Sequence, residues 1–481
     1  MKTIVIIGGG FSGTMTAVNL ARFARQPARV VIVNYRRPLG RGTAYGTRRP
    51  EHLLNVAARN MSALADQPDN FVNWLRCRSE YGETPEAELR ETFVPRRVYG
   101  DYLRSLSFGY FKPIDERGPV AIETYEDEAI DIEAHAGGGM LVSLAGGELI
   151  EADHVVLATG NQPPAPLADL PDGFAHSAYV ADPWSEWESR TPDADQDVVL
   201  LGAGLTMVDT LLTLLARDWR GNIIAVSRSG MLPQSHFRGI DYREFPPSDP
   251  ETLGLAALVD LIEEHCRELR QRGANPAIAV DRLRPHTQRI WKKFSLAEKQ
   301  EFLSRYAARW NVARHRIAQS IHERLTRAID AGRLRIVRGK VDAVEPCENG
   351  LRVVIETADG RRDSLTTGLA INCTGPRSQF STSEAPLFQN LLRRGLVRPD
   401  ALDMGIDVDD ELAVIGRDGR PSRCLFALGP LLKGALWETT AVPELRGQAM
   451  QLARVLLAGE AWAADDGRFR VAEEAVIEYY I

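Results

Sequence analysis

Short apolar runs that end in glycine turns recur along the chain. Residues 4–7 are all apolar, which is typical of a strand buried on both faces of a parallel sheet, and the pattern Gly-x-Gly-x-x-Gly follows from Gly8 to Gly13. Apolar residues then recur at helical spacing over 17–24, and a second apolar strand is predicted over 29–33. The pattern predicts a strand, a tight turn and a helix, the order in which a protein holds the diphosphate of a dinucleotide.

Each glycine of this first turn has a physical role. We expect Gly8 to permit the turn, Gly10 to let the backbone approach a diphosphate, and Gly13 to let the helix pack closely on the strand. Phe11 and Ser12 belong to the same turn, where the N-terminus of the helix favours negative charge, and are also candidate binding residues.

A second unit of the same kind begins near the middle of the chain. Residues 197–201 lead into Gly202-Ala203-Gly204-Leu205-Thr206-Met207, and 208–215 again has helical apolar spacing. Met207 replaces the third glycine, so a side chain must fit between helix and strand. The candidate binding residues of this turn are Gly202, Gly204, Leu205 and Thr206.

The residues that end the second strand of each unit bear on the ligand. An acidic residue usually stands there and binds a ribose, but the first unit has Asn34, whose amide oxygen can still accept a hydrogen bond. The second unit has Ser227 and Arg228, which can hydrogen-bond and neutralise a 2′-phosphate. This pair favours NADP over NAD at the second turn.

Each unit is followed by an apolar strand that ends in Thr-Gly. These strands are predicted over 155–160 and 369–376, and the stretches 118–153 and 334–364 before them contain the glycine turns of antiparallel meanders. The candidate ligand contacts at the two strand ends are Thr159, Gly160, Thr374 and Gly375.

A long charged segment over about 253–329 has helical periodicity. Its cations are interleaved with glutamates, so the simplest interpretation is a solvated helical face. The alternative is a helical cap over a substrate pocket. In that case an anionic group of the substrate, or the phosphates of NADP, would be received by Arg284, His286, Arg314 or His315.

The composition narrows the class of protein. The 481 residues are 44% hydrophobic and 26% charged, as in a soluble globular protein of several domains, and a net charge of −7 argues against a nucleic-acid partner. We expect no signal peptide and no membrane span, because no apolar run approaches about 20 residues. Five cysteines without close spacing and nine scattered histidines fit a reduced cytoplasm and predict no metal site.

Taken together, these motifs resemble the flavoproteins with two dinucleotide-binding domains, which include the disulfide reductases and the class B flavin monooxygenases. A narrower resemblance is to a bacterial group of FAD-NAD(P)-binding proteins. It is carried by Gly40 to Thr47, Leu53 to Val56, Met61 to Ala63, Pro95-Arg96, Tyr99 to Tyr102, Gly202 to Asp209 and Glu438 to Arg446. The resemblance implies FAD at the first glycine turn and NADPH at the second.

The expected fold is α/β, with two Rossmann-like dinucleotide-binding domains, β-meanders and a helical insert. We expect an FAD domain over 1–190, an NADPH domain over 191–371 that carries the insert, and a return to the FAD domain over 372–481. The sequence leaves the oligomeric state open.

The resemblance also implies further site residues. A loop with Gly42, Ala44 and Tyr45 would lie against the FAD, and Asn55 and Met61 would approach its ring system. In the return segment the implied contacts are Gly429, Thr440 and Ala441, the last two at a helix start whose amides would favour negative charge.

Two of these positions are candidate catalytic residues. The Asn55 amide could stabilise developing charge without titrating, although the alternative is a turn-forming asparagine. The segment Gly173 to Tyr179 loosely resembles the linker of the class B monooxygenases and makes His176 a candidate, although an ordinary linker histidine packed under Trp184 is equally compatible.

The absence of a closely spaced cysteine pair bears on the expected reaction. A disulfide reductase needs two thiols beside the flavin, and the chain has no closely spaced pair. We therefore expect an NADPH-reduced flavin monooxygenase that acts on a small molecule. The candidate positions of oxygenation are a nitrogen or a sulfur atom. The alternatives are an oxygen-independent FAD/NADPH oxidoreductase and a redox sensor that binds dinucleotides without catalysis.

Overall fold

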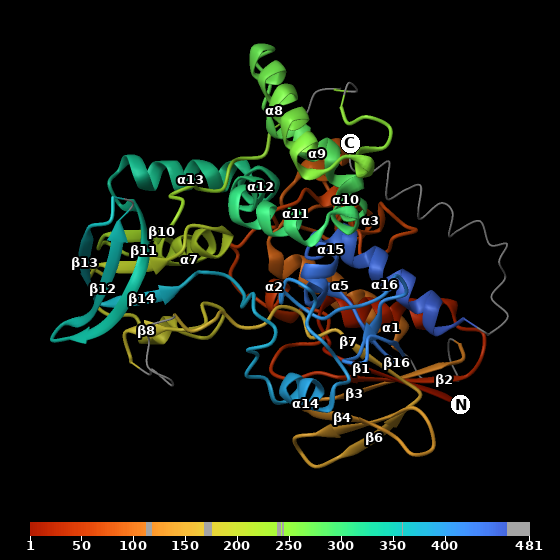
Figure 1. Cartoon of the computed structure of the whole chain (residues 1–481). Coiled ribbons are helices and arrows are strands. Elements are labelled where there is room, and N and C mark those ends of the chain that lie inside the picture. Colours follow the sequence, from red (N-terminus) through yellow and green to blue (C-terminus); the bar gives the residue numbers. More distant parts are fainter. Residues whose placement is uncertain (112–117, 168–175, 238–241, 243–244, 358, 459–481) are drawn as a thin grey trace.

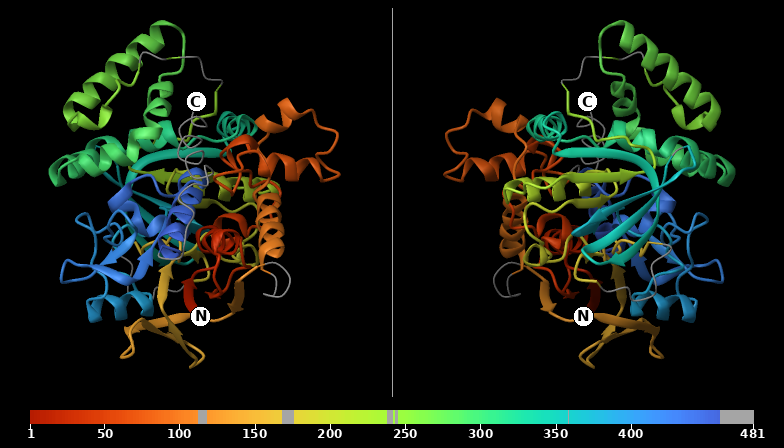
Figure 2. Two further views of the ribbon diagram at one scale, coloured as in Figure 1. Left: turned by 90° about the vertical axis from the view of Figure 1, so that its right-hand side faces the viewer. Right: turned by 90° about the vertical axis from the view of Figure 1, so that its left-hand side faces the viewer.

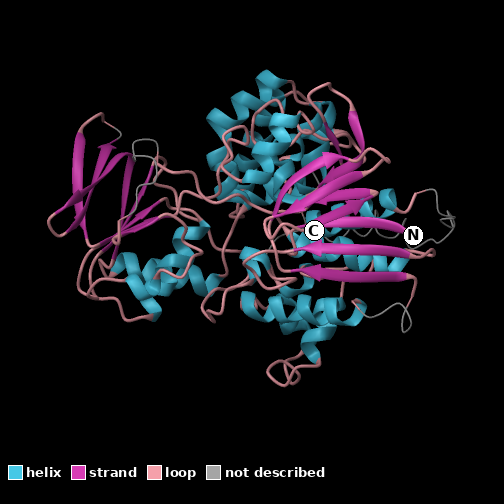
Figure 3. Cartoon of the chain, turned by 90° about the horizontal axis from the view of Figure 1, so that it is seen from below, coloured by secondary structure: helices cyan, strands magenta, loops and turns pink. Residues whose placement is uncertain are grey.

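The computed structural model contains two large β-sheets that lie side by side, with a group of helices at their junction (Figure 1). It describes residues 1–111, 118–167, 176–237, 242, 245–357 and 359–458. Seen from below, the two sheets are separate sets of strands with helices packed on each (Figure 3). The predicted α/β architecture with two dinucleotide-binding domains is confirmed.

The first sheet has six strands in the order β15-β16-β7-β1-β2-β3, of which only the β15–β16 pair is antiparallel. Its centre is the predicted apolar run 4–7, which is fully or almost fully buried in the core of the first domain. The strands are β1 (Lys2–Ile7), β2 (Ala28–Val33), β3 (Val120–Tyr125), β7 (His154–Leu157), β15 (Ala413–Ile415) and β16 (Pro421–Ala427).

Helix α1 (Phe11–Phe23) begins inside the glycine turn and packs against α5 (Arg96–Tyr110) and α16 (Val442–Leu456). The C-terminal return segment therefore packs with the first domain. The short elements of this domain are α2 (Gly42–Tyr45), η1 (Ala58–Asn60), α3 (Asn70–Arg76), α4 (Glu86–Glu91), α14 (Pro386–Arg394), η6 (Gly429–Leu432) and α15 (Lys433–Leu436).

The second sheet has seven strands in the order β13-β12-β11-β10-β9-β14-β8. Its glycine turn lies between β9 and α7 (Leu205–Ala216), and the parallel neighbours of β9 are β10 and β14. The same arrangement surrounds β1 in the first sheet, so the repeat seen in the sequence is a repeat of structure. The strands are β8 (Tyr179–Val180), β9 (Val198–Leu201), β10 (Ile223–Ser227), β11 (Leu334–Cys347), β12 (Gly350–Thr357), β13 (Arg362–Thr367) and β14 (Leu369–Asn372).

Both predicted meanders form. The first is a separate antiparallel sheet of β4 (Ala129–Ala134), β5 (Met140–Leu144) and β6 (Leu149–Ala152), whereas β3, at the start of the same stretch, joins the large parallel sheet. The second runs through β11, β12 and β13 and extends the second sheet, because the start of β11 pairs with β10 in parallel.

The predicted helical insert is present between β10 and β11. In the two side views its green helices lie at the opposite end of the molecule from the first meander (Figure 2). Its elements are η3 (Pro250–Thr252), α8 (Leu255–Gln271), α9 (Ala277–Leu283), η4 (Arg284–His286), α10 (Thr287–Lys293), α11 (Leu296–Glu301), the π-helix η5 (Phe302–Tyr306), α12 (Ala307–Arg314) and α13 (Gln319–Asp330).

The chain crosses between the two sheets twice. Strand β8 pairs with β14 of the second sheet, so the residues from about 178 already lie with the second domain, before the short helix η2 (Glu188–Arg190) and before residue 190. The return crossing follows β14, close to residue 372. Within the part of the chain that the structure describes, no helix is both long enough and apolar enough to cross a membrane.

Candidate functional site: a dinucleotide cavity at the first glycine turn

A cavity of about 990 Å³ lies at the carboxyl ends of the strands of the first sheet. The first glycine turn forms one side of it. Tyr179, the first residue of β8, and Asn372, the last residue of β14, also line it and belong to the second sheet. Ligands of open α/β sheets bind at this edge, and here one cavity reaches both domains.

The first glycine turn has the geometry that its sequence predicts. Gly8 has φ +107°, and a Cβ there would lie 2.4 Å from the carbonyl oxygen of Ala158, so a side chain is excluded by both backbone and space. A Cβ at Gly13 would lie 1.9 Å from the carbonyl oxygen of Gly8. At Gly10, by contrast, a Cβ would approach only the Cα of Gly42, at 3.7 Å, because this position faces the cavity.

Many of the residues predicted to bind FAD line this cavity. They are Gly8, Gly10, Phe11, Ser12, Asn34, Gly42, Ala44, Tyr45, Thr159, Gly160 and Thr440. They come from the first turn, the end of β2, α2, the end of β7 and the start of α16, which the fold brings to one edge of the sheet.

The Asn34 amide is partly used by the protein itself. Its Oδ1 accepts a hydrogen bond from the Gly9 amide at 3.1 Å, and its Nδ2 donates to the carbonyl oxygen of Arg37 at 2.6 Å. An acidic side chain could accept the first bond but could not donate the second. Asn34 therefore braces the glycine turn, and its oxygen keeps a lone pair for a ribose hydroxyl.

The cavity has features that fit a bound dinucleotide. The hydroxyl Oγ1 of Thr159 is buried at its wall and has no hydrogen-bond partner among the described residues. Buried polar groups without partners are uncommon in folded proteins, so a ligand at this position would satisfy the hydroxyl. Together with the open space at Gly10, this residue indicates that the cavity accepts a diphosphate and its sugar.

Sequence reasoning missed three cations of this cavity: Arg37, Arg41 and Arg377 line it. Arg41 pairs with Asp101 at 2.5 Å, and Arg377 pairs with Glu384 at 2.5 Å. Because Arg377 reaches the cavity from a loop more than 300 residues after the first turn, no local motif identifies it. The Arg41 side chain also packs near Gly100, within the resembling segment Tyr99 to Tyr102.

The second glycine turn repeats the first. Gly202 has φ +126°, and a Cβ there would lie 2.4 Å from the carbonyl oxygen of Cys373, just as Gly8 lies against Ala158. At Gly204 a Cβ would have no neighbour within 4 Å. Leu205 and Thr206 start α7 immediately after it. Met207 is fully buried, so the helix accommodates the side chain that replaces the third glycine.

Two arginines lie near the carboxyl end of β10, one directly after β10 and one on the neighbouring strand β11. Arg228 follows β10 and is exposed, and Ser227 is paired in register with Arg338 on β11, which is also exposed. The two arginines have no carboxylate partner among the described residues. Arg338 was missed because it lies more than 100 residues further along the chain, although the parallel pairing of β10 and β11 places it beside Ser227. The Ser227 hydroxyl accepts a hydrogen bond from the Gly230 amide at 3.0 Å.

The threonine of the second Thr-Gly pair is hydrogen-bonded within its own strand end. The Thr374 hydroxyl donates to Oδ1 of Asn372 at 2.6 Å, and Gly375 has φ +89° with open space at its Cβ position. Gly160 has the same left-handed backbone, φ +73°, and the same open space. The two strand ends are thus matched in conformation as well as in sequence.

Met61, Gly429 and Ala441 do not line the cavity. Met61 is 2% exposed and packs in the core of the first domain, so its side chain does not approach a ligand there. Gly429 has φ +82° and is held by Gln448, and Ala441 is the residue before α16. Both support the start of α16, from which Thr440 reaches the cavity.

The two candidate catalytic residues lie in loops. The carbonyl oxygen of Asn55 accepts a hydrogen bond from Nε2 of His236, a second-domain residue, at 2.7 Å. Nδ1 of His176 accepts from the Ala178 amide at 3.2 Å, just before β8. Residues 173–175 of the predicted linker motif lie outside the described part of the chain, and neither candidate lines the dinucleotide cavity.

The cysteines do not form the pair of thiols that a disulfide reductase needs. All five are unpaired, and burial raises the pKa of Cys373 to about 12, so this thiol beside Gly202 stays protonated at neutral pH. Among the described residues, no group of three or more His, Cys, Asp or Glu side chains could hold a metal ion.

A buried ion cluster ties the insert to the start of α16. Arg314, 8% exposed, lies between Glu438, whose Oε2 is 3.6 Å from its Nε, and Glu444, whose Oε1 is 3.5 Å from its Nη2. Arg284 also contacts Glu444, at 3.0 Å. Burial raises the pKa of Glu438, but the charges of Arg314 and the other nearby cations and the hydrogen bond from Trp310 together outweigh burial, so the pKa lies below its usual value.

The cluster corrects the predicted role of the insert's cations. Arg284 and Arg314 face carboxylates of the protein itself and are not available to an anionic group of a substrate. His315 is largely buried, and burial lowers its pKa to about 4, so it is neutral. His286 is half-buried and lies 3.8 Å from Glu251, another residue of the insert. Arg284 and Arg314 hold the insert on the first domain.

The comparisons with known proteins support the fold. Residues 5–162 match a family model described as FAD-NAD(P)-binding. No curated protein sequence matches the chain. The ornithine N-hydroxylase of Kutzneria sp. 744, solved with reduced FAD, NADP⁺ and L-ornithine, superposes with a TM-score of 0.62 and 15% identity, covering 94% of this chain and 98% of that one.

Two further solved structures are similar over almost their whole lengths. The ornithine hydroxylase of Pseudomonas aeruginosa has a TM-score of 0.59 at 15% identity, covering 95% of this chain and 99% of that one. The L-lysine 6-monooxygenase of Pseudomonas syringae has a TM-score of 0.60 at 16% identity, covering 99% and 100%. The chain therefore has the two-dinucleotide-binding-domain flavoprotein fold that its motifs resemble, with a first segment that matches the FAD-NAD(P)-binding family.

Proposed function

We propose that this chain is an FAD-dependent oxidoreductase that is reduced by NADPH and oxygenates a small molecule at nitrogen or sulfur. The observation that carries the proposal is the single cavity that runs from the first glycine turn to the carboxyl edge of the second sheet. A dinucleotide on the first turn would extend toward the second turn, so that the two cofactors meet between the domains.

The first-turn residues supply binding and orientation. The open position at Gly10 and the amides at the start of α1 would hold the diphosphate, and the unpartnered Thr159 hydroxyl and the Asn34 oxygen would bind polar groups of the same ligand. The start of α16 at Thr440 would place positive backbone dipole beside the ring system. Bound FAD supplies the redox chemistry, which no side chain of the chain can supply.

The second turn would hold NADPH. Gly204 leaves open space for a diphosphate, and Arg228 and Arg338 would neutralise the 2′-phosphate beside Ser227. Asn55 and His176 stay proposed catalytic positions, on resemblance alone. The domains proposed from the sequence, with the NADPH domain between the two parts of the FAD domain, agree with this assignment.

The type of reaction is inferred from the similar structures. Two are named as ornithine hydroxylases and a third as a lysine 6-monooxygenase, and each covers nearly all of this chain. A primary amine is therefore the first class of substrate to test, and a thioether represents the alternative of oxygenation at sulfur. The absence of a thiol pair beside the flavin site supports an oxygenase over a disulfide reductase.

Removing the two arginines is expected to change cofactor preference. Arg228→Ala and Arg338→Ala should each weaken NADPH binding by about 10- to 100-fold, because each loses a charge-assisted contact with the 2′-phosphate, and should leave NADH binding unchanged. Titration of each variant with NADPH and with NADH measures the ratio of the two dissociation constants.

Arg335→Ala is the matched control, because Arg335 is an exposed arginine at the start of the same strand, paired with Ile224 and away from Ser227. An unchanged NADPH to NADH preference in both variants would show that the phosphate lies elsewhere.

Oxygen consumption separates the proposed reaction from its alternatives. The FAD-loaded protein is mixed with NADPH in air, alone and with ornithine, lysine, cadaverine or a thioether, and oxygen, peroxide and oxygenated product are measured. Product formation supports the proposal. Flavin reduction by NADPH without oxygen-dependent turnover would favour an oxygen-independent oxidoreductase, and no flavin reduction would favour a redox sensor.

A further inference from the structure

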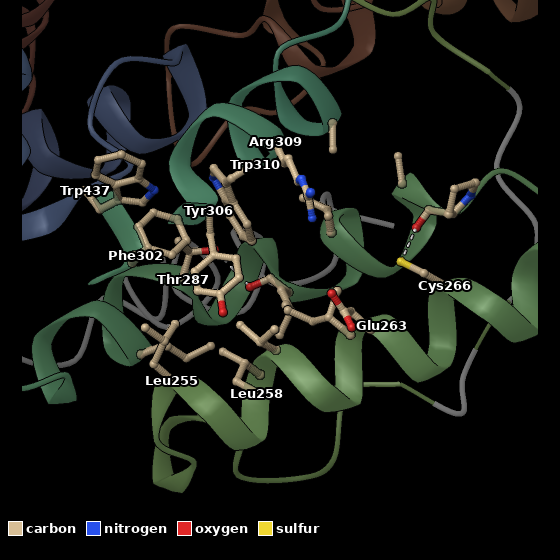
Figure 4. Close-up of a pocket in the computed structure, with 18 of the residues that line it drawn as sticks. Leu255, Leu258, Glu263, Cys266, Thr287, Phe302, Tyr306, Arg309, Trp310 and Trp437 are labelled. Atoms are coloured by element: carbon tan, nitrogen blue, oxygen red, sulfur yellow. Dashed lines mark hydrogen bonds between the residues drawn. The ribbon is translucent and has the colours of Figure 1, made fainter. Parts of the chain in front are cut away.

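A second cavity, of about 530 Å³, lies inside the helical insert. Helices α8, α9, α10, η5 and α12 surround it, and Trp437 of the first domain closes one end (Figure 4). None of its lining residues also lines the dinucleotide cavity. Its volume is in the range of about 300–1,000 Å³ that small-molecule sites have.

The walls of this insert cavity are apolar and largely aromatic. One wall is the aliphatic face of α8, with Leu255, Leu258, Val259 and Ile262. The other is a group of rings in which Trp291 and Trp437 stack with centroids 5.0 Å apart and Phe302 meets Trp437 edge-on at 5.2 Å. Rings already fixed against one another accept a further ring at little cost in side-chain freedom.

A buried hydrogen-bond donor of this wall has no partner. Of the three indole nitrogens in the lining, that of Trp291 donates to the Gly434 carbonyl oxygen at 2.8 Å and that of Trp310 donates to Oε1 of Glu438 at 2.9 Å. Trp437 is only 6% exposed, yet its Nε1 has no partner among the described residues. In Figure 4 this nitrogen lies on the side of the ring that faces Trp310 and Tyr306. A ligand with a hydrogen-bond acceptor would satisfy it.

The edge of the cavity carries positive charge. Arg309 is exposed and has no carboxylate partner among the described residues, and Arg267 and Arg270 of α8 also line the cavity. Glu263 is the one acidic side chain among the described residues that line it. The cations outnumber the acid, so the opening attracts an anionic group.

We infer that the insert cavity is a binding site for an aromatic small molecule that carries an anionic group. The ring would pack between the apolar face of α8 and the wall formed by Trp291, Phe302 and Trp437. The acceptor atoms would reach Nε1 of Trp437, and the anion would pair with Arg309. This site is separate from the two dinucleotide sites and does not depend on the reaction proposed above.

Direct binding to the FAD-loaded full-length protein tests the inference. The probes are indole-3-acetate and 1-anilinonaphthalene-8-sulfonate, which are aromatic anions, and tryptamine, which has the same ring as the first but a cation in place of its anion. Calorimetry measures all three, and the fluorescence of the sulfonate gives a second readout. Both anions should bind, should compete with each other, and should leave FAD in place, whereas tryptamine should bind at least about tenfold more weakly.

Two variants locate the site. Trp437→Phe keeps a ring and removes the donor, and Arg309→Gln removes the charge; each should weaken both anions by about tenfold. Arg305→Gln is the control, since Arg305 lies on the same helical stretch, pairs with Glu301 at 2.6 Å and does not line the cavity. The inference is overturned if neither anion binds, if tryptamine binds as tightly, or if Arg309→Gln and Trp437→Phe bind both anions as the parent protein does.

Discussion

Replacing Gly10 by valine is expected to give a folded protein that has lost its flavin. Gly10 has φ −76°, which any residue adopts, and a Cβ there would contact only the Cα of Gly42, at 3.7 Å. The new side chain would instead occupy the cavity that is proposed to hold the diphosphate of FAD. We expect FAD affinity to fall about 100-fold, because the steric conflict is worth about 3 kcal/mol. Visible absorbance of the purified protein and titration with FAD measure the loss.

Two further glycines serve as controls. Gly204→Val makes the same change in the second turn, where a Cβ has no neighbour within 4 Å, and should keep the flavin while losing tight NADPH binding. Gly13→Ala places a Cβ 1.9 Å from the carbonyl oxygen of Gly8 and should disturb folding itself. A Gly10→Val protein that binds FAD as tightly as the parent would refute the assignment of the first turn.

Replacing Arg314 by methionine is expected to destabilise the whole protein. The change leaves the buried carboxylate of Glu438 without its closest cation and removes one of the two cations beside Glu444. Breaking a buried ion pair from one side costs about 3–5 kcal/mol of the free energy of unfolding, even where the pair itself contributes little. Urea unfolding of the parent and the variant, compared at equal FAD saturation, measures this difference.

Arg305→Met tests whether the effect is specific to burial. The Arg305 side chain is 66% exposed and pairs with Glu301 on the same helical stretch, so its loss should cost no more than about 1 kcal/mol. Adding Glu438→Gln to Arg314→Met should restore part of the lost stability, because the uncompensated charge is then removed. Equal effects of the two arginine variants would mean that the cluster does not hold the insert on the first domain.

Local sequence patterns predicted the parts of the fold that depend on local physics. The turns at Gly8 and Gly202 could be identified from the sequence because each position requires glycine. At both, φ is positive and a side chain would collide with a carbonyl oxygen. The buried runs that became β1 and β9 have the continuous apolar character of central parallel strands. The helical insert followed in the same way from its periodicity.

Contacts between distant segments were beyond such patterns. Arg338 is beside Ser227 only because β11 pairs with β10, and Arg377 reaches the cavity only because the return segment folds back on the first sheet. The cations of the insert were expected on a solvated helical face or, as the alternative, at an anionic group of the substrate or of NADP. Arg314 is instead buried and neutralised by Glu438 and Glu444, which lie more than 120 residues away in the chain. Charge pairing of this kind depends on tertiary packing, which spacing in the sequence does not reveal.

Anaerobic mixing of the FAD-loaded protein with NADPH tests most directly whether one chain brings the two cofactors together. The account predicts one FAD per chain and a loss of the oxidised flavin absorbance, at a rate that saturates with NADPH concentration and is much lower with NADH at the same concentration. A folded chain that takes up no FAD, or whose bound FAD keeps its oxidised spectrum in excess NADPH, would contradict it.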